Sequence, residues 1–352
     1  MEKPKVRISV RNLVEFILRS GDLDNSRGSS GDKEAMLKGG RLHRKIQRSM
    51  KGNYQAEVSL KRESEYEDVI IQVEGRADGI FTEDGEFWID EIKGTYGNLQ
   101  AMEVPVPVHR AQAMCYGWIY GEKEGLSQIG IQMTYSHLDT EDTRRFREIF
   151  SMEELKNWYQ KLLDDYHKWI SCSLSWKKER NASMKDLQFP FPYREGQREI
   201  VSGVYHTVSS KKTLFVQAPT GVGKTMSAIF PSVRAIGEGK GETLFYLTAK
   251  TITGTVAWEA FHTLRENGLK FKVTAITAKE KLCFLDSPEC TPEKCPYAKG
   301  HFDRVNDAVY ELLTSSDELN REILEEQARK WKVCPYEMSL DVAVWVDAII
   351  CD

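Results

Sequence analysis

The run APTGVGKT at Ala218–Thr225 constrains the fold of this chain more than any other feature. Glycines in such a loop let backbone N–H groups converge on phosphate oxygens, while the lysine reaches the β- and γ-phosphates and the threonine hydroxyl binds Mg²⁺. The loop needs a buried strand before it and a helix after it. Thr213–Gln217 predicts the strand, and Lys224–Ile236 predicts the helix, kinked at Pro231. The residues expected to bind ATP here are Thr220, Gly221, Val222, Gly223, Lys224 and Thr225, the last also as a ligand of Mg²⁺.

Length and composition limit the class of protein. A chain of 352 residues suits two domains. With 41% hydrophobic and 29% charged residues the composition is globular, and no apolar run approaches the ~18 residues that span a bilayer. We therefore expect a cytoplasmic location and no membrane association. The net charge of −4 means that any DNA contact must come from local basic patches.

The N-terminal half contains a predicted hairpin with two acids in register. Val69–Phe81 and Phe87–Lys93 both alternate like strands, and Asp84-Gly85 between them is a strong two-residue turn signal. This turn places Asp78 directly opposite Glu91 on one face of the sheet.

Directly opposed residues have Cβ atoms about 5 Å apart. Two carboxylates that close repel by roughly 4 kcal/mol at an effective dielectric near 20, so a cation or a proton is needed between them. Lys93 lies two residues beyond Glu91 and therefore shares its face, whereas Asp90 and Ile92 point the other way. Asp78, Glu91 and Lys93 are the candidate catalytic residues, with a divalent metal between the two acids.

An Asp followed by Glu-x-Lys on the next strand resembles the PD-(D/E)XK nucleases, in particular their RecB-like branch. His43 in GGRLHRKIQ matches the upstream histidine ligand of that branch. Gln112 and Tyr116 in HRAQAMCYGWIY match its Gln-x-x-x-Tyr motif and lie one helical turn apart, so we expect them to contact DNA. The similarity covers about residues 8–170 and predicts a mixed-sheet, restriction-endonuclease-like domain at 1–172.

The resemblance implies a metal-dependent DNA nuclease. His43, Asp78, Glu91 and the carbonyl of Ile92 are expected to bind Mg²⁺ or Mn²⁺, with Lys93 assisting phosphodiester hydrolysis. The alternative is a silent nuclease fold that only clamps DNA. The polar, serine-rich stretch that follows predicts a linker at 173–192, with a solvated charge run at Lys177–Arg180.

The C-terminal half resembles superfamily 2 helicases. Gln197 in FPYREGQ is the candidate for adenine recognition, with Tyr193 or Arg194 packing nearby. Leu244–Thr248 predicts a second buried strand. Thr248, Lys250 and Thr251 after it are expected to touch a DNA backbone without reading sequence.

Four of the seven cysteines fall in one stretch after the phosphate loop, which in a cytosolic chain favours metal ligation over disulfides. They are Cys283, Cys290, Cys295 and Cys334. A four-cysteine insertion at this place is similar to that of the XPD/DinG-like DNA helicases, and the resemblance implies a [4Fe-4S] cluster. Zinc is one alternative, because thiolate ligands alone do not separate the two metal centres, and free thiols are the other.

The predicted architecture is a two-domain α/β protein. Its second part is a partial RecA-like P-loop domain at 193–352 with a helical four-cysteine insertion at about 280–336. Asp317-Glu318 predicts a helix start rather than the acidic box of a motor, so we expect further sequence after Asp352 and no unwinding by this chain alone. The family implies 5′ to 3′ translocation on single-stranded DNA, or DNA with single-stranded tails, in repair or recombination. The alternative is an unrelated P-loop ATPase, of the kinase or transporter type, with a zinc module.

Overall fold

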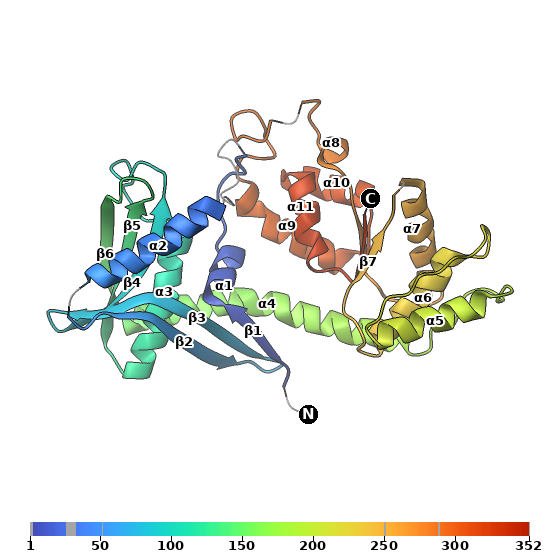
Figure 1. The fold of residues 1–352 in the computed structure, drawn as a ribbon, viewed down its shortest axis with the longest axis horizontal. Coiled ribbons are helices and arrows are strands. Elements are labelled where there is room, and N and C mark those ends of the chain that lie inside the picture. Colours follow the sequence, from blue (N-terminus) through green and yellow to red (C-terminus); the bar gives the residue numbers. More distant parts are fainter. Residues whose placement is uncertain (1–2, 26–32, 51, 250, 288, 352) are drawn as a thin grey trace. The chain divides into compact units, whose positions relative to one another are not determined.

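The computed structural model describes residues 3–25, 33–50, 52–249, 251–287 and 289–351. The chain divides into two compact units (Figure 1). Unit 1 comprises Met1–Ser20 and Asn25–Ser171, and unit 2 comprises Gly21–Asp24 and Cys172–Asp352. Both contain helices and a sheet, so the predicted α/β class is confirmed.

Unit 1 is built on a mixed sheet, six-stranded within the described residues. Its strands are β1 (Lys5–Ser9), β2 (Gln55–Glu65), β3 (Ile70–Glu83), β4 (Glu86–Thr95), β5 (Gln128–His137) and β6 (Thr143–Ser151). Its helices are α1 (Val10–Ile17), α2 (Lys33–Ser49), α3 (Pro107–Glu124) and the first part of α4 (Met152–Met184).

The predicted hairpin is β3 and β4. Asp84 and Gly85 both have positive φ, 52° and 85°, as a two-residue turn of type I′ requires. Pairing runs from Glu83↔Glu86 to Gly79↔Asp90, so the predicted register is confirmed. In the described residues this ladder stops one pair before Asp78 and Glu91.

The long strand β3 explains why the ladder stops there. β2 pairs along one edge of β3, and β1 and β4 share the other edge. β1 takes Ile70–Glu74 and β4 takes Gly79–Glu83. Within the described residues no strand pairs with 75–78 on that edge, so the sheet opens at Asp78.

Unit 2 is built on a parallel sheet of order β7-β10-β8-β9 in the described residues. Its strands are β7 (Leu244–Leu247), β8 (Val273–Ile276), β9 (Glu318–Leu319) and β10 (Ala348–Cys351). Its helices, besides the end of α4, are α5 (Gln197–Ser209), α6 (Lys224–Gly237), α7 (Thr251–Glu266), α8 (Lys279–Leu282), α9 (His301–Ser315), α10 (Arg321–Trp331) and α11 (Pro335–Ala343).

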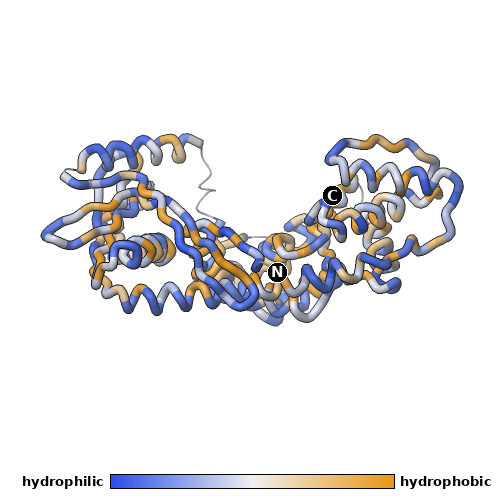
Figure 2. Tube along the Cα trace, turned by 90° about the horizontal axis from the view of Figure 1, so that it is seen from below, coloured by the Kyte–Doolittle hydropathy of each residue, from blue (hydrophilic) through white to orange (hydrophobic). Residues whose placement is uncertain are grey.

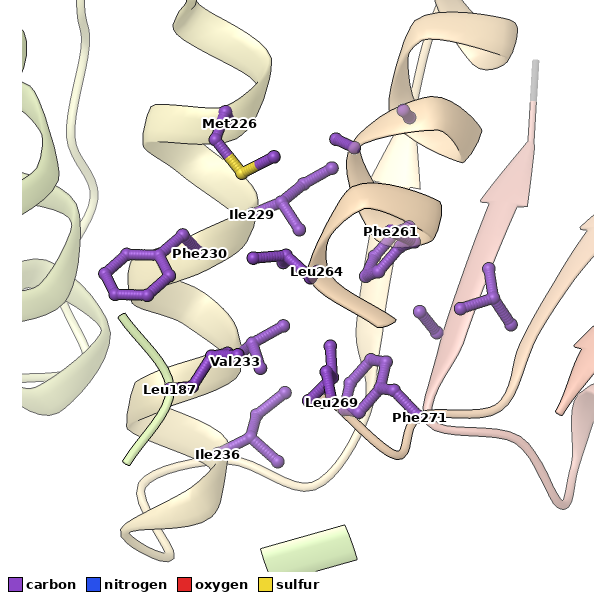
Figure 3. Packing of buried hydrophobic residues seen from close by; sticks show 14 of the residues in the cluster. Leu187, Met226, Ile229, Phe230, Val233, Ile236, Phe261, Leu264, Leu269 and Phe271 are labelled. Atoms are coloured by element: carbon purple, nitrogen blue, oxygen red, sulfur yellow. The ribbon is translucent and has the colours of Figure 1, made fainter. Parts of the chain in front are cut away.

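The core of unit 2 lies between α6, α7 and the sheet (Figure 3). Ile229 and Val233 project from α6 toward Phe261 and Leu264 of α7, and all four are buried. The predicted helix after the phosphate loop is thus confirmed, and it continues through Pro231. This packing fixes the direction in which the N-terminus of α6 points.

The predicted linker is wrong in its first half. The helix expected to end at Ile170 runs on to Met184 as part of α4. Arg180, assigned to a solvated charge run, is 5% exposed because it pairs with Asp347 at the start of β10. A polar composition predicted a loop, but a buried partner remote in sequence holds this stretch as helix.

The strand predicted at Thr213–Gln217 does not form. The segment has no regular structure, and Phe215 is 93% exposed. An apolar run becomes a strand only when a neighbouring strand takes its hydrogen bonds, and no described strand pairs with it. β7, predicted as buried, is an edge strand with Phe245 and Leu247 mostly exposed. Glu318, expected in a helix start, instead begins β9.

Hydrophobic and hydrophilic residues are mixed along the trace (Figure 2). None of the helices in the described part of the chain combines the length and the apolar character needed to cross a bilayer.

Candidate functional site

The two predicted acids and the lysine lie at the opening of the unit 1 sheet. Lys93 Nζ is 2.8 Å from Glu91 Oε1, as their common face predicts. Asp78 Oδ2 accepts a hydrogen bond of 2.7 Å from the Ile92 backbone N–H, which ties the carboxylate to β4. Glu91 is 4% exposed, whereas Asp78 and Lys93 are partly exposed. The site therefore combines one buried carboxylate, Glu91, with a more accessible carboxylate, Asp78, and a more accessible ammonium, Lys93.

Electrostatics set Glu91 apart from ordinary glutamates. Burial, followed by the nearby charge of Asp78, raises the pKa of Glu91 to about 7, although Lys93 opposes the shift. Its Oε2 is buried, and none of the described residues forms a hydrogen bond to it. A buried carboxylate oxygen without a donor is costly unless a proton or a cation satisfies it. The free oxygen of Glu91, on the side away from its contact with Lys93, therefore calls for a proton or a cation.

Helix α2 brings His43 to the acids. Leu42 and Ile46 pack on Ile92, so this helix is anchored on β4. His43 Nδ1 lies 3.6 Å from Asp78 Oδ1. Burial lowers the pKa of His43, but the hydrogen bond and charge of Asp78 outweigh it and leave the pKa raised.

Two further residues of this site were not predicted. Gln47, one turn after His43, donates to the Asp78 backbone carbonyl at 2.9 Å, and its i, i+4 spacing from His43 was an available signal. His109 has its Nδ1 3.1 Å from Tyr135 Oη. Burial, and then the charge of Lys93, lowers the pKa of His109 to about 4, so it is neutral near pH 7.

On the other face of β4, Asp90 is completely buried. Its Oδ1 accepts from Gln132 Nε2 at 3.0 Å and from Thr134 Oγ1 at 2.6 Å, and its Oδ2 accepts from Tyr54 Oη at 3.1 Å. As predicted, Asp90 points away from Glu91. These hydrogen bonds fix the strand on which Glu91 lies.

Gln112 and Tyr116 lie on α3 and are 6% and 4% exposed. The Tyr116 hydroxyl packs so closely on β3 that a Cβ at Gly75 would come within 2.7 Å of it. Burial, and then the charge of Glu91, raises the pKa of Tyr116. Tyr116 thus lies near the acids, and the contact of Gln112 and Tyr116 with DNA stays a prediction.

The geometry at the acids is not that of a formed metal site. Among the described residues, no group of three or more His, Cys, Asp or Glu side chains is arranged to hold a metal ion. Instead, Lys93 takes one oxygen of Glu91, and His43 contacts Asp78. The carboxylate oxygens of Asp78 and Glu91, including the unsatisfied oxygen of Glu91, are nevertheless ligands of the type that hard divalent cations prefer.

In unit 2 the loop predicted to bind phosphate has the positive-φ glycines and the following helix that its sequence indicates, but among the described residues it lacks the strand expected before it. Gly221 and Gly223 have φ of 85° and 83°, and α6 begins at Lys224. Lys224 Nζ donates to the carbonyls of Ala218 and Pro219 at 2.9 and 2.7 Å. Tyr246 Oη lies 3.4 Å from Thr225 Oγ1, behind the loop. Thr220 and Val222 complete the turn.

Gln197 lies against this loop. It is 4% exposed, and its Oε1 accepts from the Arg194 backbone N–H at 3.0 Å. Its Nε2 is so near Gly223 that a Cβ there would come within 2.6 Å. Arg194 also donates to the Gly221 carbonyl. Tyr193 stacks on Phe189 with ring centroids 4.4 Å apart.

The predicted DNA-backbone residues follow β7. Thr248 lines a cavity of about 360 Å³, and its N–H bonds to the Cys351 carbonyl at 3.0 Å. Lys250 lies outside the described residues, and Thr251 begins α7. Trp258, Lys281 and Arg321 line the same cavity.

The four cysteines line one small cavity of about 10 Å³, comparable to a single water. They come from the end of α8, the loop after it and the start of α11. Cys334 N–H donates to His301 Nδ1 at 3.1 Å, and burial raises the pKa of the Cys334 thiol to about 11. The fold thus brings together the four thiols predicted as ligands, although the described thiols are not arranged around a metal position.

Comparison with known proteins gives limited similarity. No family model matches the chain. A 47-residue stretch, 13% of this chain, is 40% identical to a probable ATP-dependent helicase of Methanocaldococcus jannaschii and spans 7% of that protein's length. A solved structure titled "Crystal structure of SSO0001" is similar over 46% of this chain and 78% of its own, at 20% identity and a TM-score of 0.32.

Proposed function

We propose that this chain is part of an ATP-dependent DNA helicase that also carries a metal-dependent DNA nuclease site. Three features support the proposal: the phosphate loop with Gln197 against it, the acid site of unit 1, and the short similarity to a protein named as a helicase. The partner would be DNA with a single-stranded part. Translocation from 5′ to 3′ and a role in repair or recombination follow from the resemblance of the sequence alone.

The observation that carries the nuclease part is the unsatisfied, buried oxygen of Glu91 beside Asp78. His43, Asp78 and Glu91 would hold Mg²⁺ or Mn²⁺, which when bound would neutralise phosphate charge and activate water. Lys93 places its ammonium at the acids and would stabilise charge developing on the phosphate. Gln47 and the Ile92 N–H hold Asp78 in place.

Metal-dependent cleavage of single-stranded DNA by the full chain tests this part. Glu91→Gln and Lys93→Ala should each lower the rate by about 100- to 1000-fold, the usual effect of removing one charge-stabilising group. Glu86→Gln, on the same strand at the turn, is the matched control and should cut normally. Cleavage undiminished in both site variants would refute the nuclease site. If both site variants then still bound DNA as tightly as the parent chain, with and without metal, the DNA-clamp alternative would be favoured.

The nucleotide part rests on the loop geometry. Backbone N–H groups of 221–225 and the N-terminus of α6 would face the phosphates, and Lys224 would exchange its two carbonyl partners for phosphate oxygens. Thr225 would bind the magnesium of Mg·ATP, and Gln197 would lie near the base.

Binding of a fluorescent ATP analogue tests this part. Lys224→Ala should weaken binding by roughly 10- to 100-fold, because a hydrogen bond to a charged group is lost. Lys240→Ala, an exposed lysine just after α6, is the control and should bind like the parent chain. Equal affinity of all three proteins would exclude nucleotide binding at this loop.

We propose that the four cysteines hold a [4Fe-4S] cluster, with zinc as the alternative. The support is their convergence on one cavity. A bound cluster would supply structural closure of the α9 to α11 region rather than chemistry. Iron and visible absorption in protein purified without oxygen would support the cluster. Stoichiometric zinc without iron would support the zinc alternative instead.

A further inference from the structure

Four residues near the start of the chain belong to unit 2. Gly21–Asp24 groups with Cys172–Asp352, although the chain on either side of it belongs to unit 1. Two backbone bonds hold it: Leu23 N–H donates to the Ala298 carbonyl at 2.9 Å, and Phe302 N–H donates to the Gly21 carbonyl at 3.0 Å. These contacts lie some 280 positions apart in sequence.

Side chains make the docking specific. Asp22 Oδ1 accepts from Gly300 N–H at 2.6 Å, and Gly300 is the residue that caps the N-terminus of α9. Asp303, in the first turn of α9, accepts from Gly21 N–H at 2.7 Å. A carboxylate at a helix N-terminus satisfies a free N–H and the helix dipole together.

The side chain of Leu23 closes the cysteine cavity. It is 7% exposed and packs with Cys295, Ala298 and Cys334 in one buried cluster. It also lines the cavity that all four cysteines share. Since the cysteines come from the second half of unit 2, the cavity is complete only when this remote segment is in place.

We propose that Gly21–Asp24 is an integral wall of the cysteine pocket. The buried thiols of Cys295 and Cys334, and any metal that they hold, are then shielded from solvent only while this segment is docked. The statement about metal rests on the proposed function of the cysteines, whereas the statement about the thiols does not. Without the wall, water and oxidants would reach Cys295 and Cys334, and thiol reactivity rises with access.

Alkylation of metal-free, reduced protein tests the wall, with mass spectrometry reading each cysteine. In Leu23→Ser the labelling rates of Cys295 and Cys334 should rise by about tenfold or more, because losing a buried leucine contact favours the open state. Cys115, fully buried in unit 1, should keep its rate. Leu319→Ser is the matched control in unit 2, since Leu319 is fully buried but does not line the pocket.

Unchanged labelling of Cys295 and Cys334 in Leu23→Ser overturns the proposal, as does an equal rise in Leu319→Ser. If Leu23→Ser fails to fold, Asp22→Asn decides by the same readout, because it removes the charge at Gly300 and keeps the leucine. A second readout is the time for which bound iron or zinc resists removal by a chelator. This time should be shorter in Leu23→Ser than in the parent chain. Absence of any bound metal would refute metal ligation by the cysteines. The labelling rates alone would then decide whether Gly21–Asp24 forms a wall of the pocket.

Discussion

Arg180 and Asp347 form a buried ion pair, with Nη1 2.7 Å from Oδ1 and both side chains about 5% exposed. Asp347 Oδ2 also accepts from Trp176 Nε1 and from the Lys272 N–H, each at 2.8 Å. The carboxylate thus joins the end of α4 to two neighbouring strands of the unit 2 sheet. Three donors around one acid leave little desolvation cost uncompensated.

Asp347→Ala should lower the unfolding free energy of unit 2 by about 3–5 kcal/mol, because it leaves the Arg180 charge buried without its partner. Urea unfolding followed by tryptophan fluorescence measures the change. Glu179→Ala is the control: Glu179 precedes Arg180 but pairs with Lys270 on the surface, so its loss should matter little. Equal stability of both variants would show that the buried pair contributes nothing.

The stability of metal-free protein should fall as the pH rises because of Glu91. Its pKa is raised from 4.5 to about 7, so the folded state holds this proton more tightly than the unfolded chain. The contribution is complete below pH 4.5 and is lost as the pH rises through about 7. Glu91→Gln should therefore gain stability over the parent across this window, by at most about 1.4 kcal/mol per pH unit.

Unfolding free energies of both proteins between pH 4.5 and 8 check this. Glu148→Gln is the control, because hydrogen bonds from Arg110 lower the pKa of Glu148, so its contribution changes only below this window and the difference from the parent should stay constant across it. A Glu91→Gln curve parallel to that of the parent would contradict the raised pKa.

Gly223→Ala should impair the phosphate loop. Its φ of 83° costs a side chain about 1–2 kcal/mol, and the added Cβ would lie 2.6 Å from Gln197 Nε2. We expect at least about tenfold weaker binding of nucleotide with the helices retained. Gly239→Ala has a similar φ of 74° and open space, so it controls for backbone strain alone. Similar affinities of the two variants would argue against a role for Gly223 in binding.

Gly85→Ala should weaken the hairpin that holds the acids. Gly85 has φ of 85° in the turn, so alanine should cost unit 1 about 1 kcal/mol, and asparagine should cost less because it tolerates this conformation better. Thermal unfolding of the two variants measures the order. Alanine as stable as asparagine would contradict the positive φ.

The hairpin and its acids could be predicted because they depend on neighbouring residues. The Asp84-Gly85 turn fixes the register, and the register fixes that Asp78 and Glu91 approach each other. The period of a strand likewise gave the shared face of Glu91 and Lys93. The i, i+4 spacing from His43 placed Gln47 on the same face of its helix, but nothing local indicated that this helix would bring Gln47 to the carbonyl of Asp78.

The predictions that failed depend on partners remote in sequence. Thr213–Gln217 is apolar enough for a strand but has no pairing strand among the described residues. The segment at 173–184 is polar enough for a linker but becomes helix because Arg180 finds Asp347. Composition describes what a segment can do, and its partners decide which of these it does.

By itself the sequence determined the α/β class, the β3/β4 hairpin with its facing acids, and a glycine loop leading into α6, because turns, periodicity and positive φ are local properties. Only the tertiary structure decided that α4 continues through the expected linker, that Glu91 is buried with an unsatisfied oxygen, and that Leu23 reaches the cysteines. Burial and long-range pairing depend on contacts between residues far apart in the chain, which no local pattern encodes.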